Sequence, residues 1–264
     1  MTTTPKPQAI AATILADKRQ GTKFPTNLEA IVSSTSNLEL ECVDVPQQFE
    51  GRIELCRNTP TIFLNLQGRR FDHPRTRFTL GHELGHFFLH RAMLRSGKPI
   101  HDAIIGFGED LPQIEREANE FSSELLLPPP LVKSFLSGNI LTIERIGELS
   151  ELAKASLQAT AIKVATLSSS MSCFFWQSGE AIQWSAPTQA WRASKHPSSS
   201  WRNRLPESSH IASTDESFEA REVPRVAWHP NAWTTAPLYE SALRTPYGRL
   251  VLVVDPSTDS FIES

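Results

Sequence analysis

The sequence of 264 residues lacks the features that would place it in several special classes of protein. Its only cysteines, Cys42, Cys56 and Cys173, are too few and too far apart for a disulfide framework, so we expect a reducing compartment, the cytoplasm. No apolar run approaches the ~18 residues of a membrane-spanning helix. No cluster of basic residues precedes the short apolar stretch at positions 9–16, so a signal peptide is not expected either.

Positive charge is also scarce. The formal net charge is −3, which gives no electrostatic reason to expect direct binding of nucleic acid or of an acidic membrane.

Tryptophan is absent from the first 175 residues, yet six tryptophans follow between Trp176 and Trp233. This asymmetry predicts a boundary near residue 170, with one domain over 1–170 and a second over 171–264.

The pattern of apolar residues and turn signals predicts a mixed α+β organisation. In the first part we expect a helix at 9–18, strands at 39–45, 51–56 and 61–66, a helix from 72–74 to about 91, a loop at 93–112, a helix at 113–127, and short helices within 131–168. After residue 170 we expect a hairpin around 174–184, a poorly periodic stretch at 187–233, and two strands near 238 and 250–254, which together form a β-rich C-terminal domain.

The segment 82–86 reads His-Glu-Leu-Gly-His. On a helix, residues four apart lie on one face about 5–6 Å from each other, so His82 and His86 can bind a single zinc ion. Glu83 is the next residue along the helix and can act as general base toward a water molecule at the metal. Gly81 and Gly85 are also four apart, and two glycines inside a helix predict close approach of another backbone.

A catalytic zinc site uses a third protein ligand, and the predicted helix 113–127 carries four carboxylates. Glu115 aligns with small residues at Ala118 and Ser122, which would let this helix lie against Gly81 and Gly85. We therefore predict Glu115 as the third ligand. The next candidate is Glu117. It shares one helix face with Glu120 and Glu124, and we expect that face to be exposed to solvent.

These motifs together resemble the ImmA/IrrE family of zinc metallopeptidases, over roughly residues 61–168. The similarity rests on Arg77-Phe78-Thr79-Leu80-Gly81 before the His-Glu pair, and on the later run Ile114-Glu115-x-x-Ala118-Asn119-x-Phe121. The resemblance implies one zinc ion held by His82, His86 and Glu115, and Glu83 as catalytic base. It implies a small zincin-like peptidase domain, in which a short sheet accompanies the zinc-binding helices, followed by a helical segment and then the β-rich domain.

The resemblance also implies a function. Members of the family cleave a partner transcriptional repressor of the helix-turn-helix type, in stress responses or mobile-element induction. We therefore expect a zinc endopeptidase that acts on such a repressor, with the C-terminal domain regulatory or substrate-selecting. The alternative is a zinc-stabilised binding module that sequesters a regulatory protein without cutting it, although Glu83 favours the enzyme.

Other segments and residues carry weaker signals. Residues 141–168 have the spacing of a helix-turn-helix motif, but they carry no excess of basic residues that would bind the phosphates of DNA. We therefore expect them to pack within the peptidase domain. His90 is expected to be a helix-end residue favoured by the helix dipole. The strand at 61–66 is the candidate edge strand for a peptide substrate. Possible partners of the oxyanion are His101, Tyr239 and Tyr247.

Overall fold

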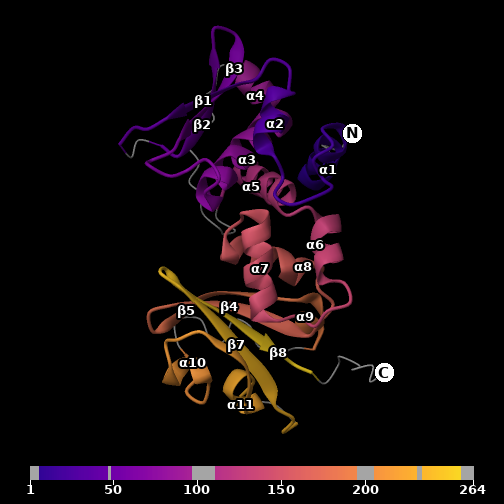
Figure 1. Cartoon of the computed structure of the whole chain (residues 1–264), viewed down its shortest axis with the longest axis vertical. Helices are drawn as coiled ribbons and strands as arrows, with labels where there is room; N and C mark the ends of the chain where they lie inside the picture. Colours follow the sequence, from indigo (N-terminus) through magenta and orange to yellow (C-terminus); the bar gives the residue numbers. More distant parts are fainter. Residues whose placement is uncertain (1–5, 47–48, 97–110, 195–204, 231–233, 257–264) are drawn as a thin grey trace. The chain divides into compact units, whose positions relative to one another are not determined.

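The computed structural model of the chain describes residues 6–46, 49–96, 111–194, 205–230 and 234–256 (Figure 1). The chain divides into two compact units. The first comprises residues 1–131 with 152–156, and the second comprises 132–151 with 157–264. Among the helices that these described stretches contain, none combines the length and the apolar character needed to cross a membrane.

In its described residues, the first unit combines five helices with a three-stranded sheet. Its elements are α1 (Pro7–Asp17), α2 (Leu28–Ser33), β1 (Glu39–Val43), β2 (Gly51–Cys56), β3 (Thr59–Asn65), α3 (Pro74–Leu89), α4 (Arg91–Arg95) and α5 (Gln113–Leu126). The strand order is β1-β3-β2, with β1 parallel and β2 antiparallel to β3. The predicted helices and strands of this part are therefore present with shifted ends, whereas α2 and α4 were not predicted. Helix α4 overlaps the start of the loop expected at 93–112, and residues 97–110 of that loop lie outside the described residues.

The sheet order corrects one expectation. The strand at 61–66 was predicted to be an edge strand, but β3 is hydrogen-bonded on both sides and is central. Ile62 and Leu64, both fully buried, lie on the same face of this central strand, because alternate residues of a strand point to one side. Within the described residues, the edge strand antiparallel to β3 is β2.

Helices α3 and α5 pack against each other through their smallest residues. A Cβ atom placed on Gly85 would lie 2.9 Å from the Cα atom of Ala118, and one placed on Gly81 would overlap the Ser122 hydroxyl. The Ser122 hydroxyl also donates a hydrogen bond of 2.9 Å to the carbonyl oxygen of Phe78. The prediction of a close helix–helix approach at the two glycines is confirmed.

The second unit is built on a five-stranded antiparallel sheet of order β5-β4-β8-β7-β6. The chain enters it along α6 (Pro129–Leu136) and continues through α7 (Ile143–Ala153), α8 (Leu157–Leu167), β4 (Ser172–Ser178), β5 (Ala181–Pro187), α9 (Gln189–Ala193), α10 (His210–Ser213), β6 (Phe218–Val223), α11 (Arg225–Trp228), β7 (Leu238–Thr245) and β8 (Gly248–Val254). Helices α7 and α8 lie over one face of this sheet, and α10 and α11 over the other (Figure 1).

Cover on both faces explains the composition of the central strands. Six of the seven residues of β4 are buried, so the strand shows no alternation of polar and apolar side chains. Trp191 and Trp228, both fully buried, fill the core on the face of α10 and α11 together with Phe175. The predicted hairpin and the two C-terminal strands are present, while β6 and the short helices within 187–233 were not predicted.

The α+β fold class is confirmed, with a small first unit that carries the short sheet and a β-rich C-terminal part. The predicted domain boundary near residue 170, between 1–170 and 171–264, stays a prediction. By contacts alone, most of α6, α7 and α8 groups with the C-terminal sheet.

The contact of α3 with α5 predicts that Gly85→Ala destabilises the protein. The added methyl group meets the backbone of Ala118, which cannot rotate away, so we expect a loss of about 1–3 kcal/mol in the free energy of unfolding. Urea denaturation of the metal-free protein measures this loss without any contribution from a bound ion.

Gly81→Ala provides the matched comparison, because the obstacle there is the Ser122 side chain. The double variant Gly81→Ala/Ser122→Ala should recover part of the stability lost by Gly81→Ala alone. Wild-type stability of Gly85→Ala would contradict the close approach.

Candidate metal centre

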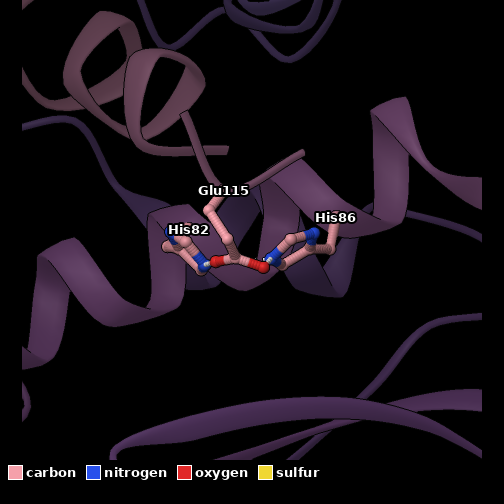
Figure 2. Close-up of side chains that lie close together, drawn as sticks. All are labelled: His82, His86 and Glu115. Carbon is pink, nitrogen blue, oxygen red and sulfur yellow. Dashed lines mark hydrogen bonds and ion pairs between the residues drawn. The ribbon is translucent and has the colours of Figure 1, made fainter. Parts of the chain in front are cut away.

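Three side chains from two helices converge in the first unit. Helix α3 carries His82 and His86 one turn apart, and α5 carries Glu115 opposite them (Figure 2). The Glu115 Oε2 atom lies 3.1 Å from His82 Nε2, and its Oε1 atom lies 3.6 Å from His86 Nε2. The two histidine Nε2 atoms are 2.9 Å apart. All three side chains are buried, and their ligand atoms lie within 4.8 Å of one another.

The other ring nitrogens of the two histidines have partners of their own. His82 Nδ1 lies 2.8 Å from the Asn119 Oδ1 atom, and His86 Nδ1 lies 3.0 Å from His90 Nδ1. A histidine that donates its Nδ1–H keeps a lone pair on Nε2 when the ring is neutral. Such outer hydrogen bonds orient the histidine ligands of metal ions and fix their tautomer.

The electrostatic environment favours ionised Glu115 and neutral His86, the forms that bind a metal, and favours positive charge at His82. Burial raises the pKa of Glu115, but its contacts with His82 and His86 outweigh burial and hold the pKa at about 2. Burial, followed by the neighbouring charges of His82 and His90, lowers the pKa of His86 to about 4 despite the contact with Glu115. Burial also lowers the pKa of His82, but Glu115 and Glu83 outweigh it and raise the pKa, so this position stabilises positive charge.

The donor set fits a divalent cation. Two imidazole Nε2 atoms and a carboxylate converge at a buried position, where Glu115 Oε2 lies 3.1 Å from His82 Nε2. Nitrogen lone pairs this close repel each other unless a proton or a metal cation lies between them. Two imidazole nitrogens and one carboxylate oxygen are the ligand types of a catalytic zinc site, in which a fourth position stays open to water or substrate.

Glu83 lies beside this cluster on α3 and is 2% exposed. Its carboxylate rests against the first residue of β2, because a Cβ atom on Gly51 would lie 3.0 Å from Glu83 Oε1 and would overlap Thr79. Gly51 was not predicted to matter. A glycine inside a strand often marks the close approach of another group, and that signal was available in the sequence.

His90 and Glu117 also have positions that the sequence did not reveal. His90 follows the last residue of α3, as expected, but the residue is buried and its side chain contacts Glu117 as well as His86. Glu117 therefore does not lie free on a solvated face, and Glu124 on the same predicted face is buried. Of the oxyanion candidates, His101 lies outside the described residues, and Tyr239 and Tyr247 belong to the second unit.

Comparison with known proteins supports the resemblance to a peptidase family. Residues 43–165 match the IrrE N-terminal-like domain of the peptidase M78 family, which confirms the resemblance to ImmA/IrrE proteins for that segment. A Mycobacterium tuberculosis transcriptional regulator has a similar fold, with a TM-score of 0.54 and 11% sequence identity over 94% of this chain and 76% of that chain. No curated protein matches this chain in sequence.

The cluster predicts that zinc stabilises the folded protein. A ligand that binds only the native state at 100 times its dissociation constant adds about 2.7 kcal/mol to the free energy of unfolding. Thermal unfolding with zinc and with a chelator should therefore differ, and His82→Ala should abolish the difference.

His73→Ala is the control for this measurement. His73 lies before the first turn of the same helix, where its Nδ1 accepts a 3.2 Å hydrogen bond from the Arg75 N–H. This variant loses a helix cap, worth about 1 kcal/mol, but should keep the full zinc-dependent increment. An equal zinc response in His82→Ala would exclude the cluster as the binding site.

Proposed function

We propose, from the IrrE N-terminal-like domain in residues 43–165, that this protein is a zinc-dependent endopeptidase of regulated proteolysis. The observation that carries the proposal is Glu83, a buried carboxylate placed beside a cluster of two histidines and a glutamate. A site that only bound a metal for stability would not need this group. In the proposal, His82, His86 and Glu115 hold one zinc ion per chain.

The chemistry follows from the positions of these side chains. A zinc ion bound there would lower the pKa of a water molecule and polarise the carbonyl group of the scissile bond. Glu83 takes a proton from the attacking water, whose oxygen bonds to the carbonyl carbon. When the carbon–nitrogen bond breaks, Glu83 returns the proton to the leaving amine. The backbone at Gly51 lies against the Glu83 carboxylate and restricts its movement on that side.

Strand β2 is positioned to bind the substrate backbone. The Asn65 N–H donates to the carbonyl oxygen of Glu50 at 2.9 Å, which sets the alternation of hydrogen bonds between β2 and β3. The backbone groups of Gly51, Ile53 and Leu55 therefore point to the other side of β2. An extended peptide added along this edge would pass the residue that contacts Glu83.

The proposed substrate is a transcriptional repressor of the helix-turn-helix type, cleaved in a stress response or in mobile-element induction. This part rests on what the family resemblance implies and not on a contact in the structure. Residues 141–168 are proposed to serve the peptidase domain. Residues 171–264 are proposed to select the substrate or to regulate cleavage, and the cytoplasm is the proposed compartment.

The first test separates the enzyme from a binding module. Glu83→Gln should keep about one zinc per chain and abolish cleavage, because the amide cannot accept the proton of water. His82→Ala should lose both zinc and cleavage. The assay follows a candidate helix-turn-helix repressor, starting with one encoded beside this gene, by gel and mass spectrometry.

The binding-module alternative makes the opposite prediction. Full biological activity of Glu83→Gln would show that the protein acts without cutting, and the enzyme assignment would then be wrong. Binding of the uncut repressor by Glu83→Gln, measured by pull-down, shows that the variant is still folded.

A second test addresses the substrate edge. Leu55→Pro removes a backbone N–H that β3 does not use, while proline is tolerated in an edge strand. Loss of one hydrogen bond to substrate should lower kcat/KM roughly fivefold, equivalent to about 1 kcal/mol. Leu55→Ala removes the side chain but keeps the N–H, so it is the control. Equal rates for the two variants would argue against binding along β2.

A further inference from the structure

A chain of hydrogen bonds leads from the metal cluster toward the surface of the first unit. His86 Nδ1 lies 3.0 Å from His90 Nδ1, and His90 Nε2 lies 3.0 Å from Glu117 Oε2. The other carboxylate oxygen of Glu117 accepts a hydrogen bond of 2.7 Å from the Gln113 side chain. The His90 side chain is 7% exposed and that of Glu117 is 25% exposed, so the chain begins in the interior and ends at solvent.

When His90 carries one ring proton, the donors and acceptors along this chain leave one consistent arrangement. An ionised carboxylate can only accept, so His90 must donate its Nε2–H to Glu117. A neutral His90 then has a lone pair on Nδ1, and His86 must donate its own Nδ1–H to that lone pair. The remaining nitrogen of His86, Nε2, therefore carries a lone pair that faces Glu115, while Nδ1 points away from it (Figure 2).

We propose that His90 and Glu117 are positioning residues, which hold His86 as the tautomer that binds the metal. The proposal rests on the proposed function, because it assumes that His86 is a metal ligand. Neither residue belongs to the cluster of His82, His86 and Glu115 that would hold the metal. Glu117 accepts the Nε2–H of His90, which leaves the His90 Nδ1 atom as the acceptor for the Nδ1–H of His86. Without Glu117, His90 could adopt the other tautomer and direct an Nδ1–H at His86, which would favour the form of His86 that cannot bind.

This role differs from simple capping of α3. A cap would require only that His90 pack at the end of the helix, and its orientation toward Glu117 on α5 would not affect His86. The two roles therefore separate at Glu117, which is partly exposed and can be replaced with little effect on the core. Glu120→Ala is the matched control, because it removes a carboxylate from an exposed position of the same helix.

The first experiment determines the tautomer directly. Long-range ¹H–¹⁵N spectra of the metal-free protein at neutral pH distinguish the Nδ1–H form of histidine from the Nε2–H form. We expect the Nδ1–H form of His86 in the wild type and in Glu120→Ala, and a mixture of forms in Glu117→Ala. An unchanged His86 tautomer in Glu117→Ala would overturn the proposal.

The second experiment measures the consequence for metal binding. Competition with a chromophoric chelator should give a zinc affinity that is about 10–100-fold lower in Glu117→Ala than in Glu120→Ala. The two variants should unfold alike in urea when metal-free. Glu117→Gln keeps an acceptor for His90 and should lose less affinity. Equal affinities of Glu117→Ala and Glu120→Ala would refute the positioning role.

His90 variants complete the series. His90→Asn retains an oxygen near the position of Nδ1 that can accept from His86, whereas His90→Leu retains none, so zinc affinity should fall from the wild type through Asn to Leu. The absorption spectrum of the cobalt-substituted protein should change in the same order. Failure of the wild type to bind zinc would instead refute the proposed function, so the two failures are distinguishable.

Discussion

The close approach of α3 to α5 is the constraint on which the metal cluster depends. Gly85 lies against the backbone of Ala118, and this contact sets the separation of the two helices. At that separation, residues one turn apart on α5, Glu115 and Asn119, both reach His82. The cost of a glycine in a helix, about 1 kcal/mol, is therefore offset by a contact that no larger residue would allow.

Hydrogen bonding around the cluster follows from the same helix pairing. Helix α5 supplies the acceptor for each outer ring nitrogen, Asn119 directly for His82, and Glu117 through His90 for His86. Both histidines direct their Nε2 atoms toward Glu115 in a buried position, where unpaired polar atoms are costly. A metal cation bound there would pair with all three side chains.

The second unit uses its tryptophans for its own core. Trp191 and Trp228 are fully buried, and Trp228 donates a 2.8 Å hydrogen bond to the buried Glu240. Glu240 also accepts from the Ser209 hydroxyl, so its buried carboxyl group has hydrogen-bond donors inside the unit. For Trp191 and Trp228, the tryptophan-rich composition of this part of the chain therefore reflects packing of the core. If residues 171–264 select the substrate, as proposed, surface residues of the second unit would do so.

The sequence by itself determined the helix that carries His82, Glu83 and His86, because spacing along one helix is a local property. It also indicated Glu115, since small residues at a helical period marked the face of α5 that meets α3. Only the tertiary structure decided that β2 and not β3 lies at the sheet edge, that Gly51 supports Glu83, and that His90 connects to Glu117. Each of these depends on strand order or on contacts between residues far apart in the chain, which no local periodicity encodes.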